Sequence, residues 1–128
     1  MENKENKKKV LIVDDDENLI TVLTDKLTVS GFEVISAPNG LVGWKKALEI
    51  HPDVILLDIL MPDMDGWTTL EKIKEDAWGK DANIIMLTTL DKVDGVMHAM
   101  ERGSFRYIVK TQHSLDEMVE QVKVSLQS

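Results

Sequence analysis

The chain has 128 residues, of which 43% are hydrophobic and 30% are charged, and it contains no cysteine. This balance is typical of one soluble globular domain, and the lack of cysteine excludes disulfides, thiol chemistry and thiolate metal sites. The net charge of −8 argues against nucleic acid as a direct partner, because contacts to phosphate groups need a concentrated basic face.

Residues 1–8 form a polar tail, since no apolar residue occurs between Met1 and Val10. We expect this tail to be disordered and residues 9–128 to form one domain. The tail lacks the apolar block of a signal peptide, and no apolar stretch elsewhere approaches the roughly 20 residues that cross a bilayer. The sequence therefore predicts a cytoplasmic protein without a membrane partner.

The first strand is expected at Val10–Val13, and it leads directly into a helix. Four acidic residues, 14–17, follow the strand, and acidic side chains are favoured in the first turn of a helix. An apolar stripe at helical spacing comes next, formed by Leu19, Leu23 and Leu27. Gly31 can end this helix in the left-handed conformation, and a second strand is expected at Phe32–Ile35.

Asn39 can cap the second helix, and Pro52 prevents the helix from continuing beyond His51. The expected apolar face of this helix consists of Leu41, Trp44 and Leu48. The third strand, Val54–Asp58, has four apolar residues in a row and ends in a carboxylate, which suits a strand covered on both faces. After a loop that contains Pro62, a third helix is expected with the stripe Trp67, Leu70 and Ile73.

The second half of the chain repeats this alternation. A fourth strand is expected at Asn83–Leu87, followed by Thr88, and a fourth helix from Asp91 to Gly103. The fifth strand, Tyr107–Val109, ends in Lys110. The last helix begins with a capping box, Ser114 to Glu117, and its apolar stripe is Leu115, Met118, Val119, Val122 and Leu126.

Five strands that alternate with five helices predict an α/β fold in which helices cover both faces of a parallel sheet. Right-handed crossovers leave few topologies, and the commonest at this size is the doubly wound, flavodoxin-like order 2-1-3-4-5. Such sheets bind ligands at the carboxyl ends of their strands, in the crevice between strands one and three. This crevice is where we expect the functional site.

Polar side chains follow four of the five expected strands. They are Asp14 and Asp15 after the first, Asp58 after the third, Thr88 after the fourth and Lys110 after the fifth. Each alone could be a helix cap, a turn residue or a surface cation, but the topology brings all of them to one crevice. Three carboxylates there repel one another unless a cation neutralises them, and oxygen ligands suit Mg²⁺ or Mn²⁺.

A magnesium site beside a carboxylate, a hydroxyl and a lysine suits phosphoryl transfer, which depends on positioning and charge neutralisation. Asp58 is the expected nucleophile, and its product would be an aspartyl-phosphate. Asp14 and Asp15 would hold the metal on one side, while Lys110 would offset the charge of the phosphoryl oxygens from the other. Thr88 could donate its hydroxyl hydrogen to a phosphoryl oxygen.

At these residues the chain resembles the receiver domain of two-component response regulators. The segments that carry the resemblance are residues 11–17, 58–66, 86–88 and 107–110, with Asp14-Asp15-Asp16-Glu17 in the first and Met61-Pro62-Asp63-Met64-Asp65-Gly66 in the second. It implies that residues 9–128 form a single-domain receiver similar to the chemotaxis response regulators. In such a domain a sensor histidine kinase or a phosphotransfer protein donates a phosphoryl group to the acceptor, here Asp58, in a Mg²⁺-dependent reaction. The domain would be a phosphoacceptor that promotes its own phosphorylation and dephosphorylation, and not an enzyme.

The resemblance also implies roles for individual residues. The metal contacts would be Asp15, Asp58 and the main-chain carbonyl of Leu60, with Asp14 acting mostly through water. Thr88 and Tyr107 would form the switch, in which the threonine moves toward the phosphoryl group and the aromatic side chain turns inward. This movement would alter the surface of the fourth helix, the fifth strand and the last helix, where an unidentified downstream protein would bind. The chain would be a monomer or a weak, phosphorylation-dependent dimer.

Three features depart from the family pattern. Lys110 precedes Thr111 where the family usually has proline, and we expect a trans bond there because a cis bond without proline costs about 3 kcal/mol. Thr89 stands where a small residue is usual, which narrows the path for the aromatic side chain of the switch. Apolar residues occupy two positions that govern the access of water to the acyl phosphate, so we expect slow dephosphorylation. These residues are Leu60 and Leu90.

Alternative functions remain open at this point. Thr111 makes a structural receiver that is never phosphorylated conceivable. A Mg²⁺-dependent phosphohydrolase commonly carries a second aspartate two residues after its nucleophile, where this chain has Leu60. A flavodoxin-like cofactor module would need a phosphate-binding loop after the first strand, but the acidic residues there would repel a phosphate.

Overall fold

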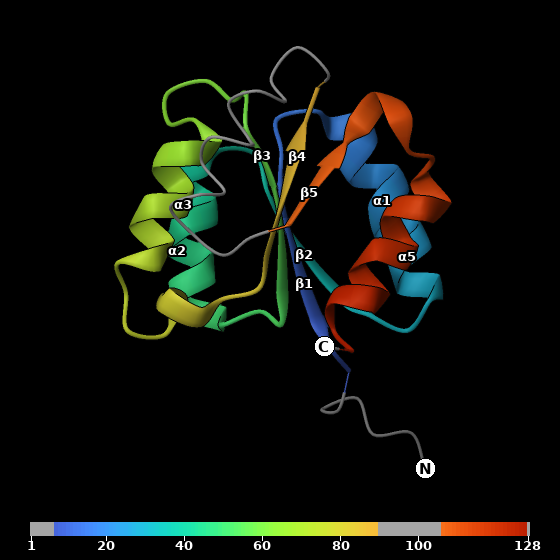
Figure 1. The fold of residues 1–128 in the computed structure, drawn as a ribbon, viewed down its shortest axis with the longest axis horizontal. Coiled ribbons are helices and arrows are strands. Elements are labelled where there is room, and N and C mark those ends of the chain that lie inside the picture. Colours follow the sequence, from blue (N-terminus) through green and yellow to red (C-terminus); the bar gives the residue numbers. More distant parts are fainter. Residues whose placement is uncertain (1–6, 90–105, 128) are drawn as a thin grey trace.

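The computed structural model describes residues 7–89 and 106–127. Five strands and four α-helices lie in these ranges, together with two short 3-10 helices (Figure 1). In chain order they are β1 (Lys9–Val13), α1 (Glu17–Val29), β2 (Glu33–Ala37), α2 (Gly40–Ile50), β3 (Val54–Asp58), α3 (Gly66–Lys74), η2 (Gly79–Asp81), β4 (Ile84–Thr88), β5 (Arg106–Val109), η4 (Lys110–Gln112) and α5 (Leu115–Ser125). The expected fourth helix, Asp91 to Gly103, lies outside the described residues, as does Leu90.

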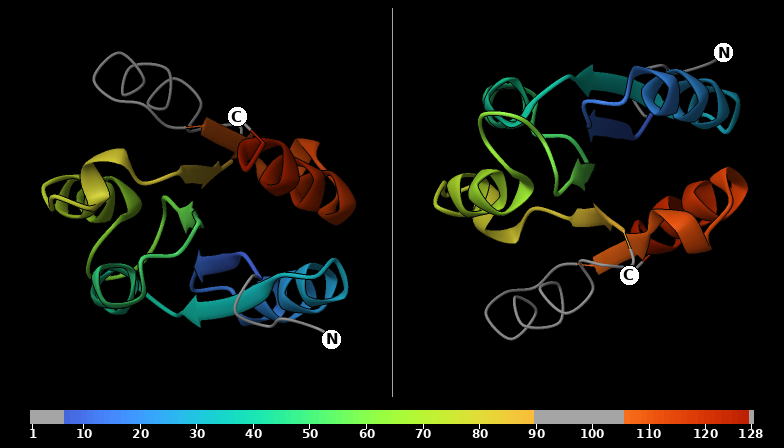
Figure 2. Two further views of the ribbon diagram at one scale, coloured as in Figure 1. Left: turned by 90° about the horizontal axis from the view of Figure 1, so that it is seen from below. Right: turned by 90° about the horizontal axis from the view of Figure 1, so that it is seen from above.

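All the strand pairs are parallel, and the sheet has the order β2-β1-β3-β4-β5, which confirms the predicted doubly wound topology. Helices α2 and α3 cover one face of the sheet, and α1 and α5 cover the other (Figures 1 and 2). Because every strand runs in the same direction, the carboxyl ends of the strands gather at one edge of the molecule. Within the described residues, no helix is long and apolar enough to span a membrane.

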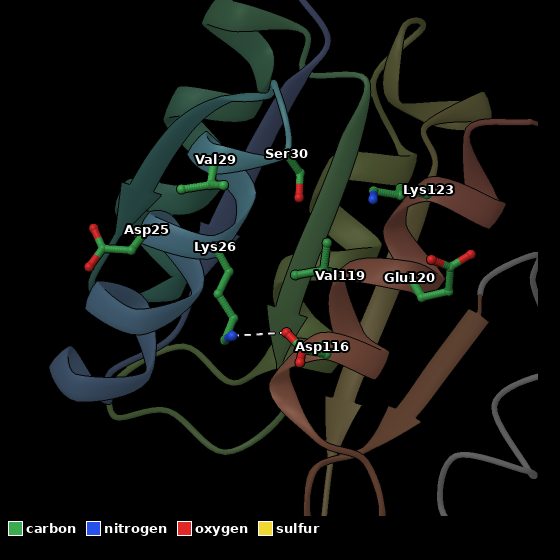
Figure 3. Close-up of a pocket in the computed structure, with 8 residues that line it drawn as sticks. All are labelled: Asp25, Lys26, Val29, Ser30, Asp116, Val119, Glu120 and Lys123. Carbon is green, nitrogen blue, oxygen red and sulfur yellow. Dashed lines mark hydrogen bonds and ion pairs between the residues drawn. The ribbon is translucent and has the colours of Figure 1, made fainter.

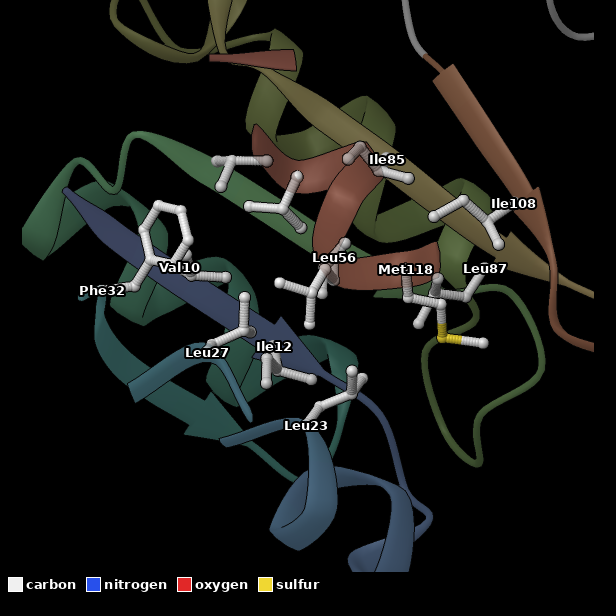
Figure 4. Packing of buried hydrophobic residues seen from close by; sticks show 13 residues of the cluster. Val10, Ile12, Leu23, Leu27, Phe32, Leu56, Ile85, Leu87, Ile108 and Met118 are labelled. Atoms are coloured by element: carbon white, nitrogen blue, oxygen red, sulfur yellow. The ribbon is translucent and has the colours of Figure 1, made fainter. Parts of the chain in front are cut away.

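The apolar residues of the strands supply two separate core layers. Side chains alternate between the faces along a strand, so Val10 and Ile12 of β1 join the layer beneath α1 and α5 (Figure 4). Leu11 and Val13 join the layer beneath α2 and α3. The five residues of β3 are all buried, as expected for a central strand that is covered on both faces.

Side-chain caps fix the residues at which the helices begin after the chain leaves the carboxyl edge of the sheet. Asp16 caps α1, Asn39 caps α2 and Asp65 caps α3, in each case by accepting a hydrogen bond from a main-chain N–H of the first helical turn. Ser114 and Glu117 form the predicted capping box of α5. Gly31, with a φ of 99°, has the predicted left-handed conformation.

The predicted apolar face of α2 is only partly right: Trp44 packs against the core layer beneath α2 and α3, but the most buried residues are others. Its buried residues are small, namely Gly40, Gly43 and Ala47, while Leu41 is 43% exposed and Trp44 and Leu48 are only partly buried. The cause is close approach to the sheet: a Cβ on Gly43 would lie 2.7 Å from the Val13 side chain. Small residues let the helix lie against β1, and its larger residues pack at the sides.

Smaller differences concern the ends of strands and one helix stripe. The second strand extends to Ala37, because Ser36 and Ala37 pair with Ile12 and Val13 of β1. The fourth strand begins at Ile84 and includes Thr88, which pairs with Val109. In α3, Leu70 and Ile73 are buried as expected, while Trp67 is partly exposed.

Candidate functional site

The carboxyl edge of the sheet brings together three aspartates. Asp14 directly follows β1, and its N–H donates to the carbonyl oxygen of Ala37 at 3.1 Å. Asp58 is the last residue of β3, where it pairs with Leu87. One carboxylate oxygen from each of Asp14, Asp15 and Asp58 lies within 4.8 Å of the other two. The site is therefore built from the two central strands at the point where the winding of the sheet reverses.

These aspartates differ in burial and in local bonding. Asp14 is fully buried, and its Oδ1 accepts a hydrogen bond of 2.9 Å from the N–H of Asp16. Asp58 is 6% exposed, whereas Asp15 is open to solvent. Two buried carboxylates close together need a compensating positive charge, and their oxygen atoms suit a hard divalent cation such as Mg²⁺. The donor set present therefore fits the metal that the sequence predicts.

Lys110, the residue directly after β5, supplies a positive charge. Its Nζ lies 2.9 Å from Asp14 Oδ2 and 3.1 Å from Asp58 Oδ1, so one ammonium group bridges both buried carboxylates. The structure places it against both aspartates, because a long lysine side chain can reach the stronger combined field of two carboxylates.

The charges of the site shift the pKa values of Asp58 and Lys110. Burial, together with the nearby charge of Asp14, raises the pKa of Asp58 from its ordinary value of 3.8 to about 6, although Lys110 opposes this shift. Burial alone would lower the pKa of Lys110, but its bonds to Asp14 and Asp58 outweigh burial and raise that pKa above its usual value. The lysine is therefore firmly cationic at neutral pH, and the pKa of Asp58 lies within about one unit of neutral pH.

Two further predicted residues lie on β4 and β5. Thr88 is 2% exposed, and its hydroxyl donates to the main-chain carbonyl of Thr89 at 3.1 Å. Tyr107 lies on the neighbouring strand β5, pairs with Met86 and is 37% exposed. The peptide bond between Lys110 and Thr111 is trans, as predicted, since the described residues contain no cis bond. Both residues belong to the short helix η4.

The loop 59–65 follows Asp58 and leaves the side chain of Leu60 exposed. Its base is closed by the N–H of Gly66, which donates to the carbonyl oxygen of Ile59 at 2.8 Å. Gly66 packs against the main chain of Asp58 and Ile59 so closely that a side chain would not fit. The side chain of Leu60 is 53% exposed. A glycine so near Asp58 in the sequence is the signal that could have predicted this close main-chain approach.

A groove of about 470 Å³ lies between α1 and α5, and none of the three aspartates lines it (Figure 3). Lys26 and Asp116 form an ion pair of 2.8 Å in its wall. Lys123, Glu120 and Asp25 also line it, so it carries charges of both signs. None of the predicted site residues lines this groove, and nothing in its mixed charges selects one kind of ligand.

Fold and site together define a doubly wound α/β protein with an acidic, lysine-bridged centre at its topological switch point. The family model described as "Response regulator receiver domain" matches residues 10–123. The chain therefore belongs to the response regulator receiver domains, which are signalling domains of two-component systems rather than enzymes of metabolism. The resemblance predicted from the sequence is confirmed.

Individual relatives agree with this assignment. The DNA-binding dual master transcriptional regulator RpaA of Synechocystis is 29% identical over 118 residues, which are 92% of this chain and 48% of RpaA. The chemotaxis protein CheY4 of Vibrio cholerae has a TM-score of 0.85 and 27% identity, covering 94% of this chain and 99% of CheY4. A putative response regulator from Chloroflexus aurantiacus has a TM-score of 0.86 and 28% identity, covering 96% of this chain and all (100%) of that one. The chain spans less than half of the length of RpaA.

Proposed function

We propose that this receiver is a phosphorylation-dependent switch whose acceptor is Asp58. The observation that carries the proposal is the bridging of Asp14 and Asp58 by the Lys110 ammonium group, at 2.9 and 3.1 Å, beside a third carboxylate from Asp15. Such a centre combines a carboxylate nucleophile with charges that can neutralise phosphoryl oxygens. A purely structural role would not require two buried carboxylates at one point.

The phosphoryl donor would be a phosphohistidine of a sensor kinase or of a phosphotransfer protein. An oxygen of the Asp58 carboxylate attacks the phosphorus, the new O–P bond forms as the P–N bond breaks, and the histidine ring leaves with the electron pair of that bond. Attack requires the ionised carboxylate, and a pKa of about 6 leaves Asp58 mostly ionised at pH 7. Lys110 already lies 3.1 Å from Asp58, so its charge is in reach of the phosphoryl oxygens.

Asp14, Asp15, Asp58 and the main-chain carbonyl of Leu60 would hold Mg²⁺, with Mn²⁺ as a substitute. When bound, the ion supplies the positive charge that balances three carboxylates and an incoming phosphoryl group. Asp14 is held rigidly for this role, because its carboxylate accepts the N–H of Asp16 and the ammonium of Lys110. Asp15, which is exposed, leaves the metal site open toward solvent.

The readout would begin at Thr88. Its hydroxyl, which now donates to the Thr89 carbonyl, would have to donate to a phosphoryl oxygen instead. Thr88 is also paired in the sheet with Val109 of β5. A movement of Thr88 would therefore shift β5, which carries Tyr107 and leads directly into Lys110. Partner binding would change on the face that includes β5 and α5, in a cytoplasmic protein that is monomeric or forms a weak dimer on phosphorylation.

The test is phosphorylation of the purified chain by acetyl phosphate with Mg²⁺, followed by intact mass and by Trp67 fluorescence. The wild type should gain one phosphoryl group, and Asp58→Asn should gain none. Glu33→Gln, an exposed carboxylate at the other end of the sheet, is the matched control and should behave as the wild type. Lack of modification in the wild type would favour the structural receiver, and turnover of a phosphate ester would favour the phosphohydrolase.

A further inference from the structure

The loop 59–65 links β3, which ends in Asp58, to α3. The first residue of helix α2 packs against the end of this loop. Gly40, the first residue of α2, lies against the main-chain carbonyl of Met64 and the hydroxyl of Thr69. A Cβ built on Gly40 would lie 2.7 Å from the Met64 carbonyl oxygen and would overlap the Thr69 hydroxyl. Gly40 therefore contacts both the end of the loop and the first turns of α3, which lies beside α2 in Figure 1.

Thr69 ties this contact back to the loop. The residue is fully buried, and its hydroxyl donates to the main-chain carbonyl of Asp65 at 2.9 Å. Asp65 in turn caps α3 by accepting the N–H of Thr68 at 2.8 Å. The last two residues of the loop, Met64 and Asp65, are thus held between α2 and α3.

Helix α2 is also held against the sheet. Gly43, three residues after Gly40, lies directly on the Val13 side chain of β1, and Ala47 is buried in the core layer beneath α2 and α3. A side chain at position 40 would therefore displace the loop rather than the helix. The base of the loop is fixed at Asp58 and Gly66, so the displacement would fall on the segment that includes Leu60.

We propose that Gly40 is a positioning residue of the phosphorylation site. Because it lacks a side chain, the loop can lie close to α2, and the position of the loop sets where the main-chain carbonyl of Leu60 stands relative to the Asp58 carboxylate. This inference rests on the proposed function, in which that carbonyl is a metal contact. Its consequence is that a residue of α2, remote from Asp58 in the sequence, tunes the affinity for Mg²⁺.

The test compares Gly40→Ala with Gly79→Ala. Gly79 lies in η2, beyond the other end of α3, and a Cβ there would also press on main chain, that of Ile73. Both variants add one methyl group against a backbone, and alanine favours helix over glycine, so neither loses helix propensity. The measurements are the Kd for Mg²⁺, from titration of Trp67 fluorescence, and the rate of phosphorylation by acetyl phosphate.

Gly40→Ala should raise the Kd for Mg²⁺ at least fivefold, while Gly79→Ala should leave it within twofold of the wild type. An unchanged Kd in Gly40→Ala, or an equal rise in both variants, would overturn the proposal. If Gly40→Ala does not fold, the double variant Gly40→Ala/Thr69→Ala removes the nearest overlap and keeps the one with the Met64 carbonyl. This double variant should also raise the Kd, and a wild-type Kd in it would again overturn the proposal.

Failure of the proposed function has a different signature. A wild type that neither binds Mg²⁺ nor accepts a phosphoryl group would refute the proposed function and this inference with it. A wild type that does both, compared with a Gly40→Ala variant of equal Mg²⁺ affinity, would refute the role of Gly40 alone.

Discussion

Replacing the Asp58 carboxylate by an amide should stabilise the metal-free protein. Burial and the charge of Asp14 raise the pKa of Asp58 from 3.8 to about 6, so ionised Asp58 opposes folding. Two pKa units correspond to about 3 kcal/mol, and solvent screening at the exposed Asp15 edge reduces this to about 1–2 kcal/mol. Asp58→Asn removes this penalty and keeps the ion pair between Lys110 and Asp14.

The sign of the pH dependence follows from the raised pKa. Between pH 3.8 and about 6 the folded state binds a proton at Asp58 that the unfolded state has lost, so the stability of the wild type falls as pH rises through this window. The difference in unfolding free energy between Asp58→Asn and the wild type should therefore be near zero below pH 4. It should grow between pH 4 and pH 6 and stay constant above pH 6.

Urea unfolding in the presence of a chelator, at a series of pH values, measures this difference directly. At pH 7 the variant should gain about 1–2 kcal/mol, or about 4–8 °C in Tm for a chain of this size. Glu33→Gln, the exposed control, should show no such window. A gain that does not vary with pH, or a variant less stable than the wild type at pH 7, would refute the electrostatic reasoning.

Three further outcomes are expected. Lys110→Met leaves two buried carboxylates without their counter-ion, so it should lose about 2–3 kcal/mol of stability in chemical denaturation and most of its phosphorylation rate; an unchanged stability would contradict the bridging role. Mg²⁺ at 100 times its Kd should stabilise the wild type by about 2.7 kcal/mol, and EDTA or Asp15→Asn should remove most of this gain in a thermal shift assay. The acyl phosphate of the wild type should decay slowly after the donor is removed, and Leu60→Asn should shorten its lifetime several-fold by admitting water; decay of the wild type within seconds would argue against this.

The sheet order and the meeting of Asp14, Asp15 and Asp58 were predictable because strand alternation and crossover handedness leave few topologies. Capping residues were equally visible, since a cap such as Asn39 acts within one helical turn. The buried face of α2 could not be predicted in this way. Apolar periodicity locates faces made of large apolar residues, and α2 instead buries two glycines and an alanine. The contact of Gly40 with Met64 and Thr69 depends on how closely two helices pack, which no local pattern encodes.

The contacts of the Lys110 ammonium group also could not be predicted from the sequence. Register places the lysine at the end of β5, but which carboxylates it contacts depends on the rotamers of a long side chain in the field of several charges. The topology predicted that Lys110 lies near the aspartates. The conformation of its side chain determines that its ammonium group contacts both Asp14 and Asp58.

The bridging ammonium group has a consequence for how the site responds to its surroundings. A divalent cation arriving at Asp14 and Asp58 meets carboxylates that already share one positive charge, so it competes with the side chain of Lys110 for part of its binding energy. In the proposed function, Mg²⁺ binding would be an exchange between two cations, one of which is covalently part of the chain. The position of Lys110 would then help to set the Mg²⁺ concentration at which Asp58 can be phosphorylated.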